Sequence, residues 1–401
     1  MKALIVGGGI AGPATAMALQ RVGVDAVVLE RRAGGSATEG SYFTIAPNGL
    51  DALDLLGALP IAREAGFPST TNTMYGASGR LLGELGLGVP LADGLVALTA
   101  KRSVLASRLL DEAERRGVEV RRAAEVTAVE SGGGGASVTL ADGVRVAADL
   151  VVGADGVRSR VRPVIDPAAP GGRYIGLTNF GGITRGTALA TMLRPEAWHF
   201  VFGARAFLGA HPTPDSDVVW FVNVSEPEIT RERRAATSPE EWQGRLVDLL
   251  QADAGPGAEL VAAGTLELAG DNTYDLPHVP HWTRDRLVLV GDAAHAPSPS
   301  SGQGASMALE DAVVLATSVR DHAPTAADLP KALRAYEQAR RARVERIVKA
   351  GARSSSSKTL GPVGRRFQEA AMSVVFRYLV TDRSTAWMTG SRLIWDRDRV
   401  A

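Results

Sequence analysis

The chain opens with Lys2-Ala3-Leu4-Ile5-Val6-Gly7-Gly8-Gly9-Ile10-Ala11-Gly12, a short apolar run that leads into a G-x-G-x-x-G sequence. In this pattern Gly7 permits a tight turn, Gly9 lets the backbone approach a pyrophosphate, and Gly12 allows a helix to pack closely on a strand. A helix starting at Ile10 and Ala11 would direct unpaired N–H groups at the phosphates. The stretch predicts a dinucleotide site; a glycine-rich turn without a ligand is the alternative.

The residues after this turn complete a βαβ unit. Helical spacing ends at Gly23, and a second apolar run is closed by Glu30. A carboxylate at this position is the expected partner of ribose hydroxyls. Arg31 and Arg32 follow and are compatible with a 2′-phosphate site or with solvated loop side chains. The negative charge of Glu30 disfavours a phosphate there.

Two further glycine–carboxylate turns each follow an apolar run. The first is Gly153-Ala154-Asp155-Gly156-Val157-Arg158-Ser159, and the second is Gly291-Asp292-Ala293-Ala294-His295. The second turn continues through Pro299, which makes the approach rigid, to Gly302-Gln303-Gly304, where a helix is expected to begin. The positive end of that helix would favour negative charge on a ligand placed before it. We expect His295 to pack behind the turn.

The composition excludes several classes of protein. Hydrophobic residues make up 45% and charged residues 22%, which is typical of a globular chain. Lysine plus arginine and aspartate plus glutamate both number 44, so no overall field favours nucleic acid or an anionic membrane. The absence of cysteine excludes disulfides, thiolate metal sites and cysteine-based redox chemistry, and no metal site is predicted. No apolar run is long enough for a membrane span, and we expect a cytoplasmic protein.

The three motifs, in this order, resemble those of the FAD-dependent monooxygenases of the p-hydroxybenzoate hydroxylase type, the group A aromatic hydroxylases and their natural-product relatives. Pro47-Asn48-Gly49 and Arg102 add to a resemblance that extends from residue 1 to roughly residue 350. Ser300 and Ser301 depart from it, because relatives often carry an aromatic or apolar residue and a glycine there.

The resemblance implies non-covalently bound FAD. It places Asp292 at the ribityl chain or ribose, Asp155 near the pyrophosphate, and Arg102 on the FAD linker. The expected cofactor-binding residues are Gly7, Gly9, Ile10, Ala11, Gly12, Glu30, Arg31, Arg102, Asp155, Asp292, Pro299, Gly302, Gln303 and Gly304.

The expected fold is α/β, with a Rossmann-like FAD-binding domain, an inserted, mostly antiparallel β-sheet domain for substrate, and C-terminal helices. Aromatic and β-branched residues concentrate in the middle of the chain, as in Val218 to Val224. We therefore assign residues 1–167 and 281–350 to the FAD-binding domain, 168–280 to the substrate domain and 351–401 to a C-terminal helical segment.

The expected substrate site lies in the inserted domain. Trp198, Phe200 and Trp220, together with Pro299, are candidates to line an apolar cavity. Aromatic residues at alternate positions are also typical of the core-facing side of an ordinary strand, and the sequence favours this interpretation at least as much. His199, His211 and His278 lie in the same region but are expected to be structural, so the catalytic residues stay unassigned.

The resemblance implies a single-component cycle in which NADPH or NADH reduces FAD, oxygen forms a C4a-hydroperoxyflavin, and one oxygen atom is transferred to an aromatic or polycyclic small molecule. The chain would be a monomer or homodimer, in a biosynthetic or degradative step. Two alternatives are a flavin-dependent reductase or dehydrogenase of the same fold and a non-catalytic FAD- or ligand-binding protein. A flavin halogenase is disfavoured, because no W-x-W-x-I-P segment is present.

Overall fold

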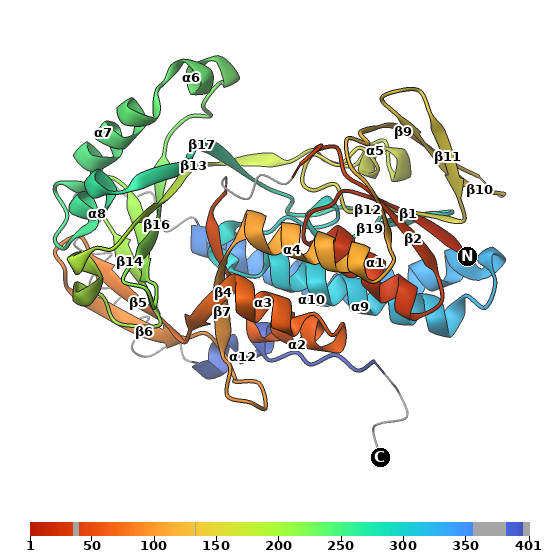
Figure 1. The fold of residues 1–401 in the computed structure, drawn as a ribbon, viewed down its shortest axis with the longest axis horizontal. Coiled ribbons are helices and arrows are strands. Elements are labelled where there is room, and N and C mark those ends of the chain that lie inside the picture. Colours follow the sequence, from red (N-terminus) through yellow and green to blue (C-terminus); the bar gives the residue numbers. More distant parts are fainter. Residues whose placement is uncertain (35–39, 133, 356–381, 396–401) are drawn as a thin grey trace.

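The computed structural model describes residues 1–34, 40–132, 134–355 and 382–395. Its elements form two parts, separated along the long axis of the molecule in Figure 1. The motif half contains the three glycine–carboxylate turns, and the sheet half contains most of the middle of the chain.

A six-stranded sheet forms the centre of the motif half, in the order β18-β19-β12-β1-β2-β8. All neighbouring strands are parallel except β18 and β19. The apolar runs in the sequence form these strands because both faces of a parallel sheet are covered. The strands are β1 (Lys2–Val6), β2 (Asp25–Leu29), β8 (Glu119–Arg121), β12 (Leu150–Gly153), β18 (Thr283–Arg284) and β19 (Leu287–Leu289). The predicted Rossmann-like α/β fold is confirmed.

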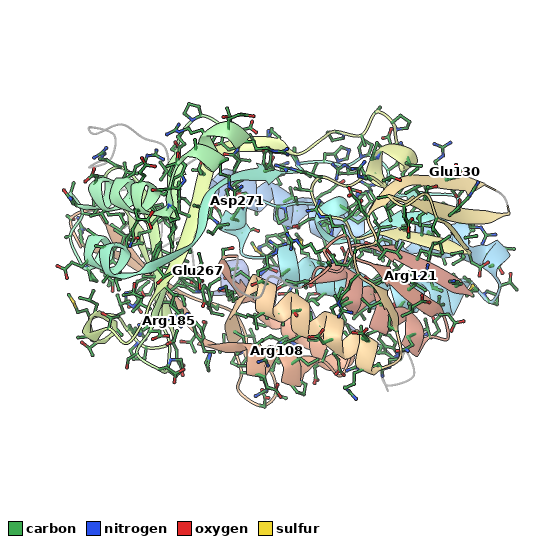
Figure 2. The ribbon with its side chains drawn as sticks, turned by 45° about the horizontal axis from the view of Figure 1, so that its top comes forward. Arg108, Arg121, Glu130, Arg185, Glu267 and Asp271 are labelled. Carbon is green, nitrogen blue, oxygen red and sulfur yellow. The ribbon has the colours of Figure 1, made fainter. Side chains whose placement is uncertain are left out.

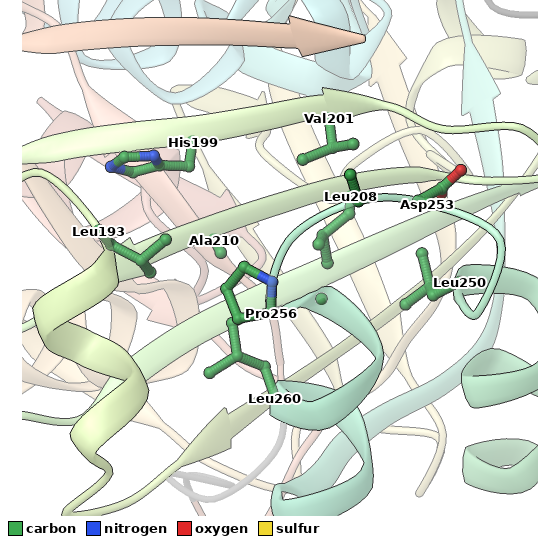
Figure 3. Close-up of a pocket in the computed structure, with 11 residues that line it drawn as sticks. Leu193, His199, Val201, Leu208, Ala210, Leu250, Asp253, Pro256 and Leu260 are labelled. Carbon is green, nitrogen blue, oxygen red and sulfur yellow. The ribbon is translucent and has the colours of Figure 1, made fainter. Parts of the chain in front are cut away.

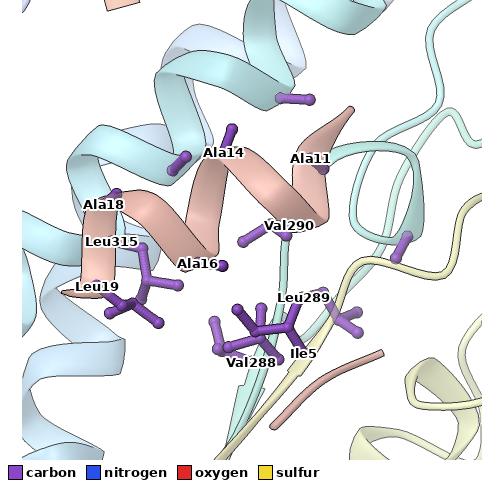
Figure 4. Close-up of a cluster of buried hydrophobic side chains, with 14 of the residues drawn as sticks. Ile5, Ala11, Ala14, Ala16, Ala18, Leu19, Val288, Leu289, Val290 and Leu315 are labelled. Atoms are coloured by element: carbon purple, nitrogen blue, oxygen red, sulfur yellow. The ribbon is translucent and has the colours of Figure 1, made fainter. Parts of the chain in front are cut away.

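Helices cover one face of this sheet and a small antiparallel sheet lies on the other (Figure 1). Close packing of the helices depends on small side chains. Figure 4 shows Ala14 directed toward the neighbouring helix α9 and Ala16 directed toward the strand of Val288. The helices are α1 (Ala11–Arg21), α4 (Arg102–Arg115), α9 (Gly304–His322) and α10 (Leu329–Ser355), and the small sheet contains β9 (Val126–Gly132), β10 (Gly135–Leu140) and β11 (Arg145–Ala148).

A seven-stranded sheet dominates the sheet half, in the order β17-β13-β16-β15-β14-β5-β6. Its neighbours are antiparallel except for β14 and β5. The predicted insert supplies β13 (Arg173–Thr184), β14 (Ala197–Phe202), β15 (Phe207–Pro212), β16 (Val218–Ser225) and β17 (Thr265–Asp275). The other two strands, β5 (Thr71–Gly76) and β6 (Leu81–Gly86), come from outside residues 168–280. The sheet is therefore wider than the segment assigned to it.

The two faces of the seven-stranded sheet have different neighbours. Helices α7 (Pro239–Leu250) and α8 (Gly257–Ala263) pack on the face that carries Phe180 and Trp220. Helix α6 (Arg231–Ala236) precedes them and has no buried residues. The opposite face carries Ile183, Trp198 and Val219 and is directed at the motif half.

Short elements join the two halves. A three-stranded sheet in the order β3-β7-β4 contains β3 (Tyr42–Ile45), β4 (Gly66–Ser69) and β7 (Ala97–Lys101), with α2 (Pro47–Leu55) and α3 (Leu59–Ala65) between β3 and β4. Further along the chain, α5 (Arg162–Ile165) follows the second motif.

The described part of the C-terminal segment lies against the motif half. Helix α12 (Asp382–Thr389) is held by Arg343 of α10, whose guanidinium donates to the carbonyl oxygens of Trp387 (2.9 Å) and Met388 (2.7 Å). The rest of the expected C-terminal helical segment, 356–381 and 396–401, is outside the described residues. Within the described ranges, no helix combines the length and apolar character required to cross a membrane.

Candidate functional site

A hollow of about 380 Å³ lies at the carboxyl ends of β1, β2 and β12. This is the edge at which open parallel sheets bind ligands. All three sequence motifs contribute to its lining. Ten expected residues line it: Gly7, Gly9, Ile10, Ala11, Glu30, Arg31, Arg102, Asp155, Asp292 and Gly304.

The three glycines of the first motif have the separate roles that the pattern predicts. Gly7 has a φ of +108°, which favours glycine. A Cβ at Gly12 would lie 1.9 Å from the carbonyl oxygen of Gly7, so Gly12 belongs to the packing of α1 and does not line the hollow. A Cβ at Gly9 would meet no atom within 4 Å, because this position faces the hollow.

Glu30 is fixed at the end of β2 by backbone hydrogen bonds. Its Oε2 accepts from the N–H of Gly8 (2.7 Å), and its Oε1 accepts from the N–H of Arg32 (2.9 Å). These bonds orient the carboxylate beside the glycine turn at the wall of the hollow. A hydroxyl-bearing ribose is the group that such an acceptor can bind.

Asp155 also uses its carboxylate to organise the turn that follows it. Its Oδ2 accepts from the N–H of Arg160 (2.7 Å). Within the described ranges, Oδ1 is buried and has no hydrogen-bond partner. Burial raises the pKa of this carboxyl, while the hydrogen bonds it accepts partly oppose the shift. A buried acceptor left unsatisfied beside a hollow indicates space for a donor from a ligand.

Asp292 lies opposite Arg102, with 3.2 Å between its Oδ2 and the guanidinium Nη2. The backbone N–H of Arg102 donates to the carbonyl oxygen of Ser41 (3.1 Å), which fixes the start of α4. Helix α9 starts at Gly304, beside Asp292, and its 19 residues direct their positive end at the hollow. The third motif thus brings an acceptor, a cation and a helix N-terminus together.

A buried charged network supports the Gly291–Asp292 turn from behind. Asp311 of α9 accepts from the N–H of Gly291 (2.9 Å) and lies 2.6 Å from His295 Nε2. The guanidinium of Arg340 donates to the other oxygen of Asp311 (2.7 Å). Burial alone would raise the pKa of Asp311, but His295 and Arg340 lower it on balance, so the carboxylate is charged. His295 packs behind the turn, as expected.

Four expected residues lie outside the lining of the hollow. Besides Gly12 these are Pro299, which is exposed, and Gly302, which ends a 3₁₀ turn with a φ of +60°. The fourth, Gln303, is 2% exposed, and its side-chain oxygen accepts from Asn48 Nδ2 (3.1 Å). Asn48 also donates to Glu310 (2.7 Å), so the motif Pro47-Asn48-Gly49 serves to join α2 to α9.

Several lining residues were not predicted. Arg158 and Arg160 line the hollow, as do Val126 of β9 and Ala305 and Ala308 of α9. Arg158 belongs to the second motif but was given no role, and Arg160 lies just beyond that motif. Ala308 is one helical turn beyond Gly304, so the sequence could have indicated all three residues. Val126 comes from a strand without a motif and could not have been found from the sequence.

Of the four candidate substrate residues, Pro299 is exposed, and the three aromatic residues separate into two groups. Trp220 is 1% exposed and donates to Thr184 Oγ1 (3.0 Å) in the core under α7 and α8, so its assignment to a substrate cavity is wrong. Trp198 is 2% exposed and bonded to Thr44 and Thr99, and it faces the motif half. Phe200 is on the same face and is only partly buried.

The three candidate histidines have structural surroundings. His199 accepts from the N–H of Arg194 (2.7 Å) and borders a cavity of about 30 Å³ on the helix-covered side of the sheet (Figure 3). This volume suits about one water molecule. His211 is fully buried beside Ser69, and burial lowers its pKa to about 4. His278 is exposed and lies 3.3 Å from Glu345.

Comparison with known proteins identifies the family. The profile of the family described as "FAD binding domain" matches residues 1–351. The chain belongs to this family. It is 30% identical over 361 residues to the FAD-dependent urate hydroxylase of Mycolicibacterium vanbaalenii, and the aligned region covers 87% of this chain and 86% of that protein. It is also 33% identical over 357 residues to the 3-amino-4-hydroxybenzoate 2-monooxygenase PtmB3 of Streptomyces platensis, covering 86% of this chain and 85% of the relative.

Solved structures of the family agree with this result. Klebsiella pneumoniae HpxO in complex with FAD and uric acid superposes with a TM-score of 0.82 and 25% identity, covering 97% of this chain and 96% of that one. The chain is an FAD-dependent monooxygenase. The resemblance seen in the three motifs is confirmed.

The residues present fit an FAD molecule. Gly9 leaves open space for a pyrophosphate, Glu30 offers an acceptor for a ribose, and Asp155 has a buried oxygen without a partner among the described residues. Arginine side chains along the hollow supply positive charge for the phosphates. The hollow ends at Asp292 and the start of α9, where the remaining part of the cofactor would lie.

Proposed function

We propose that this monooxygenase hydroxylates a small aromatic or heterocyclic molecule bound between the hollow and the seven-stranded sheet, with NADPH or NADH as electron donor. The observation that carries the proposal is that partly buried aromatic side chains of the sheet, Phe200 and Phe221, face the half that binds FAD. By their printed names, relatives act on urate and on 3-amino-4-hydroxybenzoate. A biosynthetic and a degradative role are both consistent with this chemistry.

In the proposed arrangement each motif contributes to cofactor binding, with Asp155 of the second motif near the pyrophosphate. Glu30 accepts from the adenosine ribose, Gly9 and the start of α1 bind the pyrophosphate, and Asp292 accepts from a ribityl or ribose hydroxyl. Arg102 remains beside Asp292 and contacts the linker. When bound, FAD supplies the hydride-accepting and oxygen-activating chemistry that the side chains lack.

The start of α9 has a separate role in this proposal. Its unpaired N–H groups at Gly304 and Ala305 direct positive charge at the end of the hollow. Negative charge that develops on a ring bound there would be stabilised without a movable cation. The sheet, packed against β3 and β7, would exclude water from the reacting atoms.

The test is a product-resolved assay of FAD-loaded protein with NADPH or NADH and a panel of phenols and heterocycles under labelled dioxygen. One labelled oxygen atom in the product, with hydrogen peroxide measured in parallel, supports the proposal. Turnover of a substrate without label would instead identify a reductase or dehydrogenase. Stable FAD binding without any substrate-dependent oxidation of the donor would identify a binding protein.

A further inference from the structure

The face of the seven-stranded sheet directed at the motif half carries a group of stacked and tilted rings. We call Phe200, Phe207 and Phe221 the aromatic floor. Their ring centroids are 5.5 Å apart for Phe200 and Phe207, 6.0 Å for Phe207 and Phe221, and 6.2 Å for Phe200 and Phe221. Three neighbouring strands, β14, β15 and β16, each supply one ring.

Gly209 lies under the centre of this floor. It is paired with Phe200 on one side and with Phe221 on the other. A Cβ at Gly209 would be 2.4 Å from Cε1 of Phe221 and 3.1 Å from Cε1 of Phe200. The rings therefore extend across the backbone of the glycine, and any side chain at position 209 would push them away from the sheet.

The floor adjoins the FAD-binding hollow through one pair of strands. Tyr42 of β3 packs against the cluster that includes Phe200 and Phe221, and it is paired with Lys101 of β7. The residue after Lys101 is Arg102, which lines the hollow. Lys101 and Tyr42 thus mark the boundary between the two sites.

The strands of the floor carry no charged side chain on this face, and Arg185 and Asp217, whose charges act on Tyr42 of the same cluster, lie 3.7 Å from each other. The residues of β14, β15 and β16 on this face include no lysine, arginine, aspartate or glutamate. His211, the one histidine among them, has a pKa lowered to about 4 by burial and is uncharged at neutral pH. The positive charge of Lys101 is balanced by Glu267 of β17, which is labelled in Figure 2, with 3.0 Å between Nζ and Oε1. About nine-tenths of each of these two side chains is buried.

We infer that the aromatic floor, whose rings lie over the backbone of Gly209, is the stacking surface for the substrate, and that the substrate is a neutral, planar aromatic compound without a carboxylate on the stacked ring system. This rests on the proposed function. The rings of Phe200 and Phe221 are inclined to each other by 60°, so a planar ring can stack on one of them and contact the other edge to face. A carboxylate placed there would lose its water without gaining an unpaired cation, because Lys101 is paired with Glu267 and Arg185 with Asp217.

The experiment measures binding of two probes of matched shape, 2-naphthol and 2-naphthoate, to FAD-loaded protein by isothermal titration calorimetry. We expect the wild-type protein to bind 2-naphthol at least about tenfold more tightly than 2-naphthoate. Gly209→Ala should weaken 2-naphthol binding about tenfold, because the added Cβ displaces the rings of Phe221 and Phe200 from their positions over the glycine. Gly244→Ala on α7, where a Cβ meets no atom within 4 Å, is the matched control and should bind both compounds as the wild type does.

A second variant keeps the inference testable if Gly209→Ala does not fold. Phe221→Leu keeps an apolar side chain but removes the ring, and it should weaken 2-naphthol binding by a similar factor while FAD occupancy and melting temperature stay near the wild-type values. Equal affinity for the two probes, or unchanged naphthol binding in both variants, overturns the inference. These results differ from a failure of the proposed function, which would appear as absent FAD binding or absent labelled oxygen in all proteins, the control included.

Discussion

The first motif binds the cofactor at Gly9 and packs helix against strand at Gly12. Adding one methyl group at each position in turn, as alanine, tests these two roles separately. A Cβ at Gly9 would meet no protein atom within 4 Å, so Gly9→Ala should leave the apo-protein as stable as the wild type or slightly more stable. The same methyl group would occupy space that the FAD pyrophosphate needs. Forcing an extra methyl group into a close contact costs about 1–3 kcal/mol, which corresponds to a loss of FAD affinity of about one to two orders of magnitude.

Gly12→Ala should behave in the opposite way. Its Cβ would lie 1.9 Å from the carbonyl oxygen of Gly7, a backbone atom that cannot move aside without displacing α1. We expect a lower melting temperature of the apo-protein, with FAD affinity reduced only as a consequence. Thermal unfolding of both apo-proteins and titration with FAD, followed by flavin fluorescence, measure the two effects. Wild-type FAD affinity in Gly9→Ala would refute the reasoning.

Three further predictions concern carboxylates and buried charges. Asp292→Ala should weaken FAD binding by about 1.5–3 kcal/mol, because a hydroxyl loses a charged acceptor; unchanged flavin occupancy after dialysis would contradict the assignment. The pKa of His211 falls from 6.5 to about 4 on folding, so its stabilising contribution is complete above pH 6.5 and is lost as the pH falls toward 4. The loss is about 3 kcal/mol at most, and denaturant titrations should show a smaller pH dependence in His211→Gln. Arg340→Met removes the guanidinium that pairs with both Glu310 and Asp311, and it leaves Glu310 with Arg343 and Asn48 and Asp311 with His295. Because these remaining partners compensate part of the loss, we expect a destabilisation at the lower end of the usual range, about 3 kcal/mol, in urea unfolding.

Most of the cofactor site could be predicted from the sequence because its residues lie in short continuous stretches. A turn such as Gly7 to Gly12 requires particular glycines at fixed spacing, and these requirements can be read without knowing what lies nearby. The same holds for Asp155 and Asp292, each placed directly after a buried strand. Arg158 and Arg160 were within reach of the same reasoning.

Contacts between distant segments were not predictable in this way. Trp220 and Phe221 are adjacent in the sequence, and only the pairing of β16 with its neighbours decides which of them faces the core and which faces the motif half. Gln303 is directed away from the hollow because Asn48, more than 250 residues earlier in the chain, bonds its side chain. No local pattern contains that information.

The origin of β5 and β6 has a practical consequence for anyone who wishes to exchange substrate specificity between relatives. Transplanting residues 168–280 alone would carry β14 into a new protein without its own β5, so the recipient's β5 would have to pair with a foreign edge in register from Ala197↔Thr71 to Phe202↔Gly76. A chimera with a mismatched edge exposes unpaired N–H and C=O groups and invites aggregation. Crossovers that move residues 71–86 together with the insert preserve the whole sheet.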